Sequence, residues 1–281
     1  LDGEEQRRIA KVYFSAFLET TLHGDARYRP LFRDQRLIKA WLPDTIYITR
    51  YEDSSFRTVS NFEEDIDVTT TTVAGGIQEG EHLAVWREQD VNLRRKVSRD
   101  NHAVYLGWRT AAEKPEIASY SISLRPALAQ EWKLDVDSLL VFHLAEASEK
   151  PPVPGEAEEV AGRDNKTKEK GDEDRKEPLD FTVELVTRDG SVARLPLSRF
   201  APIPPVLKMR FTKSQALEEK HYGSAPEPVL QTYELPLAAF VEANTRFNPA
   251  DLAIIRFVFD RSDKGVIILD QIGFARLRLS C

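Results

Sequence analysis

The chain has 281 residues, of which 41% are hydrophobic, 9% aromatic and 30% charged, and this composition excludes a disordered, collagen-like or membrane-embedded protein. Its formal charge of −7 argues against a surface that wraps duplex nucleic acid, so nucleic acid is not an expected partner. The single cysteine, Cys281, excludes an internal disulfide and a cysteine-built zinc site. No run of residues approaches the roughly 18 apolar positions of a membrane span.

One amphipathic helix and a connector are predicted in the first 44 residues. Ile9, Tyr13 and Phe17 recur at a spacing of four, which places them on one helical face. Gly24 marks the end of this helix, because glycine adopts the left-handed conformation at little cost. The helix needs a partner for its apolar face, either in this chain or upstream of it.

The start of the chain indicates a piece of a longer protein. The sequence begins at Leu1, and Met209 is its only methionine. We therefore expect a fragment or a processed product, and the cellular compartment stays open because a signal peptide would lie upstream.

Residues 45–281 are predicted to form a two-sheet antiparallel β-sandwich, a jelly roll. Short runs rich in Val, Ile, Thr, Tyr and Phe alternate with turn residues roughly every ten positions, which is typical of sandwiches and barrels. Short helical turns are expected at residues 126–132 and 237–242. The candidate strands are residues 45–51, 65–73, 83–88, 103–109, 117–124, 139–144, 181–187, 192–197, 206–212, 229–235, 253–260, 266–270 and 274–279.

A charged segment at residues 146–178 interrupts this pattern. It is rich in Glu, Asp and Lys and contains no aromatic residue, so it cannot bury enough apolar surface to offset the entropy lost on ordering. We predict a mobile insertion within one sandwich, and the alternative is a boundary between two domains.

Motifs of catalysis are not found in the sequence. It has no Gly-x-Ser-x-Gly nucleophile elbow, no phosphate-binding glycine loop and no His-Glu-x-x-His helix. Its five histidines are scattered singly, so surface or core packing accounts for each of them. The sequence therefore predicts that this chain performs no chemistry of its own.

Acidic side chains crowd residues 61–67, which contain Glu63 and Asp65. Their mutual repulsion is relieved either by solvent on an exposed face or by a hard cation such as calcium. Asp270, which follows an apolar run, reaches the same edge if the first and last strands of the sandwich are neighbours. The sequence leaves both interpretations open.

The tryptophans Trp41, Trp86, Trp108 and Trp132 are the candidate ligand-binding residues. Flat aromatic rings can pack against the apolar faces of sugar rings. Trp86 and Trp108 lie within predicted strands, where burial in the core is the simpler interpretation.

Two segments resemble the jelly rolls of carbohydrate-binding modules and galactose-binding-like domains. Residues 252–274, LAIIRFVFDRSDKGVIILDQIGF, are similar to their closing strands, and residues 61–65 resemble the acidic start of the same fold. Several such modules hold a structural calcium between these two places. The resemblance therefore implies Glu63, Asp65 and Asp270 as metal ligands, and a glycan or other polymer as the bound partner.

A second resemblance covers the N-terminal part. Residues 17–24, 28–32, 41–50 and 62–70 are similar to the C-terminal part of large bacterial α/β-hydrolase-like proteins, of the chlorophyllase or dienelactone-hydrolase type. It implies that the first helix ends an upstream hydrolase domain, whose catalytic residues precede Leu1. It also implies a bacterial source, and export is left open.

From these observations we expect a non-catalytic accessory β-sandwich module of a bacterial hydrolase. Such a module either binds a glycan or polymer or braces the catalytic domain. The alternative is that the chain is part of an α/β-hydrolase, a carboxylic ester hydrolase, whose catalytic residues lie upstream. No catalytic residue is assigned to this chain.

Overall fold

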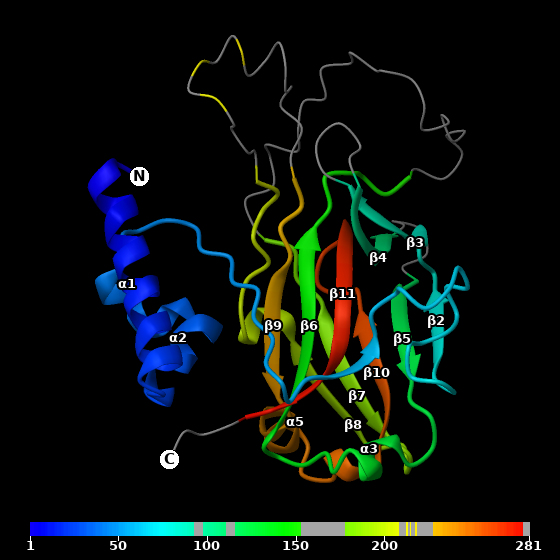
Figure 1. Ribbon diagram of the computed structural model, residues 1–281. Helices are drawn as coiled ribbons and strands as arrows, with labels where there is room; N and C mark the ends of the chain where they lie inside the picture. The colour runs from blue at the N-terminus through cyan, green and yellow to red at the C-terminus, as the bar shows by residue number, and fades with distance from the viewer. Residues whose placement is uncertain are drawn as a thin grey trace.

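The protein consists of an N-terminal helical cluster and a two-layer β-sandwich (Figure 1). The computed structural model describes residues 1–92, 98–110, 116–152, 178–207, 212, 214, 217 and 227–277. The predicted antiparallel sandwich preceded by one amphipathic helix is confirmed. In the described ranges, no helix has the length and apolar character that crossing a membrane requires.

Two antiparallel sheets form the sandwich. Sheet A has six strands: β3 (Val85–Asn92), β4 (Ser98–Arg109), β11 (Lys264–Arg276), β6 (Ser138–Glu146) and β9 (Gln231–Pro236) follow one another, and β1 (Arg57–Ser60) also pairs with β11. Sheet B has the order β2 (Ile77–Glu81), β5 (Ser119–Ser123), β10 (Leu252–Val258), β7 (Thr182–Thr187) and β8 (Val192–Pro196). The last two strands, β10 and β11, thus lie at the centres of opposite layers.

Short helices complete the fold. The helix predicted near the N-terminus is α1 (Gly3–Leu22), and the predicted helical turns are α3 (Leu128–Glu131) and α5 (Leu237–Ala243). Gly24 has a φ of +69°, as expected of a glycine that follows a helix. The remaining helical segments are η1 (Ala26–Tyr28), α2 (Arg29–Arg33), η2 (Gln35–Trp41), η4 (Leu197–Arg199) and η5 (Pro249–Asp251).

The strand predicted at residues 45–51 is wrong. This segment is extended, but it runs beside β9 without joining the sheet. Thr232 of β9 donates its backbone N–H to the carbonyl of Thr49 at 2.8 Å, and the N–H of Tyr51 is bound by the Thr232 hydroxyl at 2.9 Å. These contacts cover the outer edge of β9, where unpaired backbone groups would otherwise attract another strand.

The strand predicted at residues 65–73 is also wrong, because its side chains close turns. The carboxylate of Asp65 accepts a hydrogen bond from the N–H of Asp67, and that of Asp67 accepts one from the N–H of Thr69. Local bonds of this kind compete with a sheet ladder. The predicted strand at residues 206–212 and most of the predicted insertion lie outside the described residues.

The core lies between the inward faces of the two sheets and is rich in aromatic rings. Phe257 of β10 occupies its middle, with ring centroids 6.2 Å from Tyr120, 5.3 Å from Phe142 and 5.9 Å from Phe181. All four side chains are fully buried. Rings from both sheets therefore meet at Phe257, and their burial holds the layers together.

The helical cluster has a small core of its own. Asp2 caps α1, where its carboxylate accepts hydrogen bonds from the N–H groups of Glu4 and Glu5. Ala16 of α1 is buried together with Leu31 of α2 and with nearby residues of η2. The apolar face predicted for the first helix thus finds a partner within this chain at Ile9 and Tyr13, whereas Phe17 stays exposed.

Strand β11 joins two segments that were predicted as separate strands, 266–270 and 274–279. Its pairing with β6 shifts by one residue between Asp270 and Gly273, and Gln271 takes a φ of +50°. This is a β-bulge. Gly273 then lies so close to β1 that an added Cβ atom would stand 2.2 Å from the carbonyl oxygen of Arg57.

We predict that Gly273→Ala lowers the free energy of unfolding by roughly 2 kcal/mol or more, because the new methyl group forces β1 away from β11. Gly3→Ala is the matched control, since its Cβ would meet only the flexible side chain of Arg7 at 3.7 Å or more. Urea denaturation of both variants measures the difference. Equal stability of the two would contradict the close packing of β1.

Candidate functional site

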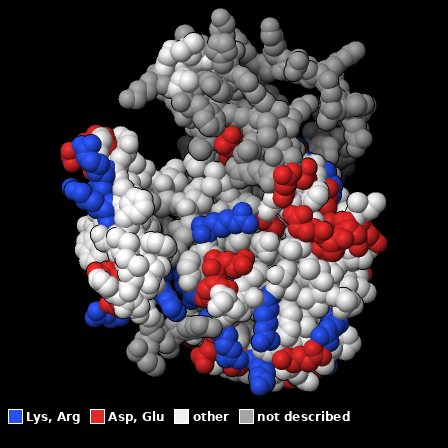
Figure 2. All heavy atoms as spheres, in the orientation of Figure 1, with Lys and Arg blue, Asp and Glu red and all other residues white. Residues whose placement is uncertain are grey.

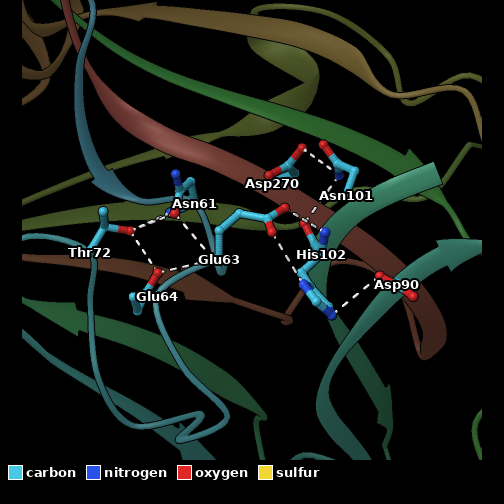
Figure 3. Close-up of polar contacts among 8 residues, drawn as sticks. All are labelled: Asn61, Glu63, Glu64, Thr72, Asp90, Asn101, His102 and Asp270. Carbon is cyan, nitrogen blue, oxygen red and sulfur yellow. Dashed lines mark hydrogen bonds and ion pairs between the residues drawn. The ribbon is translucent and has the colours of Figure 1, made fainter. Parts of the chain in front are cut away.

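The acidic loop after β1 is tied to sheet A through a histidine (Figure 3). One oxygen of Glu63 accepts a hydrogen bond from the N–H of His102 at 2.7 Å, and the other lies 3.2 Å from Nδ1 of the same ring. The Nε2 atom of His102 is 3.2 Å from Asp90 of β3. The imidazole therefore bridges carboxylates from two different elements.

Acidic side chains gather on the surface over this end of the molecule, near β2 and β3 (Figure 2). Glu88 of β3 lies beneath them and is half-buried. Burial, together with the charges of Glu64 and Asp65, raises the pKa of Glu88 to about 7. The negative charge of this loop therefore reaches Glu88, and its raised pKa favours the protonated form near neutral pH.

Asp270 is the most deeply buried carboxylate of this region. Its Oδ2 atom lies 3.3 Å from the side-chain amide of Asn101 and 3.5 Å from the guanidinium of Arg50, whereas Oδ1 has no hydrogen-bond partner among the described residues. Burial raises the pKa of Asp270 to about 6, against the opposing effects of Asn101 and Arg50. An unpaired buried oxygen is costly and calls for a ligand or a function.

The three acids predicted as metal ligands are only partly brought together. Glu63 lies close enough to Asp270 to raise its pKa, and Figure 3 shows both side chains at one end of sheet A. Asp65 is turned into its own loop, where Thr70 donates a hydrogen bond to it at 3.1 Å. Within the described ranges, no three His, Cys, Asp or Glu side chains form a ready-made metal site.

His143 lies directly opposite Asp270 in the pairing of β6 with β11. It is 2% exposed, and its Nδ1 atom has no partner among the residues described. Burial and the charge of Arg50 lower the pKa of His143 to about 4. Two buried titratable groups with unpaired atoms therefore sit side by side, a pairing that single scattered histidines did not predict.

The tryptophans predicted to bind ligand are not gathered on one surface. Trp108 is buried and stacks on Phe259, with ring centroids 4.3 Å apart. Trp86 and Trp132 also pack against the core. Trp41 is 58% exposed, but it belongs to the helical cluster. The structure therefore forms no common platform from these four residues.

An open cleft of about 560 Å³ lies between α1 and residues 47–51. Five aromatic rings and five hydrogen-bonding side chains line it: Tyr13, Phe17, Phe32, Tyr47 and Tyr51, with Thr20, Thr21, Thr49, Arg29 and Arg50. Sequence analysis missed this site, although the density of aromatic residues in the first 51 positions was a usable signal.

Arg33 of α2 fixes the helical cluster against the sandwich. Its guanidinium pairs with Asp53, lies 3.4 Å from Glu234 of β9, and stands 5.0 Å from the centre of the Tyr51 ring. All three charged side chains are largely buried, so these contacts are screened less than surface ion pairs. Arg33 therefore supports the wall of the cleft at Tyr51 from outside the lining.

No family model matches the chain, and no curated protein matches it either. Among solved structures, it is similar to a family 30 carbohydrate-binding module, at 10% identity over 71% of this chain and 80% of that one, with a TM-score of 0.40. A family 11 carbohydrate-binding module of a cellulosomal cellulase of Clostridium thermocellum has 9% identity over 80% and 96%, with a TM-score of 0.40. A β-1,2-glucanase from Parabacteroides distasonis has 10% identity over 81% and 26%, with a TM-score of 0.42.

These similarities are distant and establish no family membership. The assignment of the fold rests on the strand pairing described above. The resemblance of the N-terminal part to α/β-hydrolase-like proteins remains an expectation.

Asp270 on β11 and His143 on β6 should make the free energy of unfolding depend on pH in opposite directions. A carboxyl whose pKa is raised on folding destabilises the fold as pH rises from about 4 to about 6, and a histidine whose pKa is lowered destabilises it as pH falls from about 6.5 to about 4. The free energy of unfolding of Asp270→Asn, measured relative to that of the natural chain, should rise by roughly 2–3 kcal/mol between pH 4 and pH 7. His143→Gln should gain a similar amount as pH falls.

Denaturation at several pH values, in the presence of a chelator, measures both curves against the natural chain. Subtracting the natural curve removes the contribution of Glu88, which titrates in all three proteins. Slopes of the same sign for the two variants would contradict the assignment of either group.

Proposed function

We propose that this chain is a non-catalytic module that binds a carbohydrate in the cleft between α1 and residues 47–51. The observation that carries the proposal is the lining of the cleft, in which flat aromatic rings alternate with arginine and threonine side chains. Pockets that bind small molecules are typically apolar with a few well-placed polar groups. The cleft has this character.

The chemistry of the lining matches that of a pyranose ring. A sugar ring presents C–H groups on its faces and hydroxyls around its rim, so it needs flat apolar surfaces and hydrogen-bonding groups together. Burial and the neighbouring Tyr47 raise the pKa of Tyr13, whose hydroxyl therefore stays protonated and able to donate. Arg29 and Arg50 add charged donors at the same cleft.

The same lining argues against glycoside hydrolysis in the cleft. Such hydrolysis needs two carboxyl groups on either side of the scissile bond. The described residues that line the cleft include no Asp, Glu or His. Binding without bond cleavage would serve an attached enzyme by raising its effective concentration at a polymer.

Phe17→Ala should weaken polysaccharide binding about tenfold or more, because an exposed stacking ring is lost. Phe14→Ala is the matched control, since Phe14 lies one turn away on the same helix, is more exposed and does not line this cleft. Affinity electrophoresis with mixed-linkage β-glucan, xylan, galactomannan and alginate selects the polymer, and calorimetry with its oligosaccharide gives the affinity.

The proposal is wrong if no polymer of the panel slows the migration of the natural chain in affinity electrophoresis. It is also sunk if binding is observed but both phenylalanine variants lose it equally.

We also propose that Asp270 and Glu63 take part in holding a calcium ion. The supporting observation is the unpaired Oδ1 atom of Asp270, buried near the carboxylate of Glu63. Calcium accepts carboxylate, carbonyl and water oxygens in flexible geometry, so two acids can contribute to a site that backbone and solvent complete. When bound, the ion would neutralise charge at the acidic end of the sandwich.

Calcium should raise the melting temperature of the natural chain by about 2–4 °C, because it binds the folded state only. Asp270→Asn should abolish this response, whereas Asp65→Ala should retain it, since Asp65 is bonded within its own turn. Differential scanning fluorimetry with calcium and with a chelator measures the shift. An unchanged melting temperature in the natural chain, or an equal loss in both variants, would contradict the site.

A further inference from the structure

The outer face of sheet B carries side chains in rows that cross all five strands. Strand pairing places Glu79, Ser121, Arg256, Glu184 and Arg194 side by side on β2, β5, β10, β7 and β8. On β5, β10, β7 and β8 their neighbours along the strand point inward into the core, as alternation requires. One polar row thus runs straight across the middle of this face.

The charges in this row are fixed in place. Glu184 is 1% exposed and receives hydrogen bonds of 2.5 Å from both Arg194 and Arg256. Arg256 also donates to the hydroxyl of Ser121 at 2.9 Å. At the opposite end of the row, Glu79 is exposed, and its carboxylate makes no hydrogen bond or ion pair within the described residues. The row therefore ends in an exposed carboxylate on β2 and in an exposed guanidinium on β8.

An apolar row lies directly beside the charged one. Pairing aligns Ile77, Ser123, Ile254, Val186 and Val192 across the same five strands. Ile77 is 54% exposed, and the other four are half-buried. Four of these five side chains are apolar, and Ser123 interrupts the row between Ile77 and Ile254. Apolar side chains next to ordered charges are typical of an interface.

We propose that this face of sheet B packs against the same face of a second copy of the chain. The two-fold axis lies in the interface and runs parallel to β10, so that β2 faces β8 of the partner. Each row of one subunit then faces the same row of the other. Glu79 then faces Arg194 of the partner subunit, twice in the dimer. The apolar row faces the apolar row, with Ile77 opposite Val192 of the partner subunit.

The order of the charges favours a second copy over other occupants. Reversing the row end for end exchanges its carboxylate end for its guanidinium end, so the face is complementary to itself. At the axis Arg256 meets its own copy, and this like-charge contact is offset because each Arg256 is already paired with Glu184. A polysaccharide is the poorer fit, since the outward side chains of these five strands include no aromatic ring.

The size of the face indicates a reversible dimer. Five strands about 4.8 Å apart and rows spanning five residues cover roughly 24 by 16 Å. Obligate dimers bury considerably more surface than this. The dimer should therefore form and dissociate with protein concentration, independently of the cleft beside α1.

Sedimentation velocity of the full chain, without carbohydrate, tests the proposal. We expect a monomer–dimer equilibrium that Glu79→Arg weakens at least about tenfold, because it sets two arginines against each other. Ile77→Lys should weaken it similarly through the apolar row. Leu37→Lys is the matched control, since Leu37 is 65% exposed in the helical cluster, and it should leave the equilibrium unchanged.

A mixture of two charge variants adds a rescue. Chains carrying Glu79→Arg should associate with chains carrying Arg194→Glu, because both inter-subunit pairs are then attractive again, while each variant alone stays monomeric. Circular dichroism confirms that each variant is folded. A natural chain that is monomeric at about 500 μM overturns the proposal. So does a dimer that none of these substitutions affects, or a polysaccharide that binds the natural chain and not Ile77→Lys.

Discussion

The contact between the two sheets at Phe257 is the constraint on which the remaining structure depends. Rings from β5, from β6 and from Phe181, which directly precedes β7, meet this one side chain, so the spacing and the crossing of the layers are set at the centre of the sandwich. Everything proposed to bind a partner lies on the outside of a layer. The outward side chains keep their positions because their inward neighbours are locked in the core.

The outer faces of the two sheets differ in what covers them. Residues 45–56 cross the outside of sheet A and bury Asp270 and His143 beneath Arg50, which is why these two groups have shifted pKa values. The outside of sheet B carries ordered charges instead. The outer face of sheet A therefore carries buried polar groups under a covering segment that also lines the cleft. The outer face of sheet B stays open.

The sequence was sufficient for the elements whose burial pattern is local. The short runs at residues 181–187 and 192–197 predicted β7 and β8, and the spacing of Ile9, Tyr13 and Phe17 predicted α1. It failed where side chains bind their own backbone, as at Asp65 and Asp67, since an acidic and β-branched run also looks like a strand. Local patterns carry no information about such competition.

The candidate sites were harder to predict because they depend on pairing between distant segments. Asp270 was found through its apolar surroundings, but its neighbours Asn101 and Arg50 come from other elements. The sequence analysis chose the tryptophans as ligand-binding residues, whereas the aromatic side chains that line the cleft are phenylalanines and tyrosines. The row on sheet B becomes visible only when the register of five strands is known.

The bulge at Gln271 has a consequence for how side chains are distributed along β11. Asp270 faces outward and Ile272 faces inward, although strict alternation would send both to the same side. One inserted residue thus resets the phase of the longest strand. It lets a single segment place Asp270 on the outer face of sheet A, buried beneath the chain that covers it, and place Ile272 and Phe274 in the core. One backbone irregularity thus meets two demands that an ideal strand could not meet together.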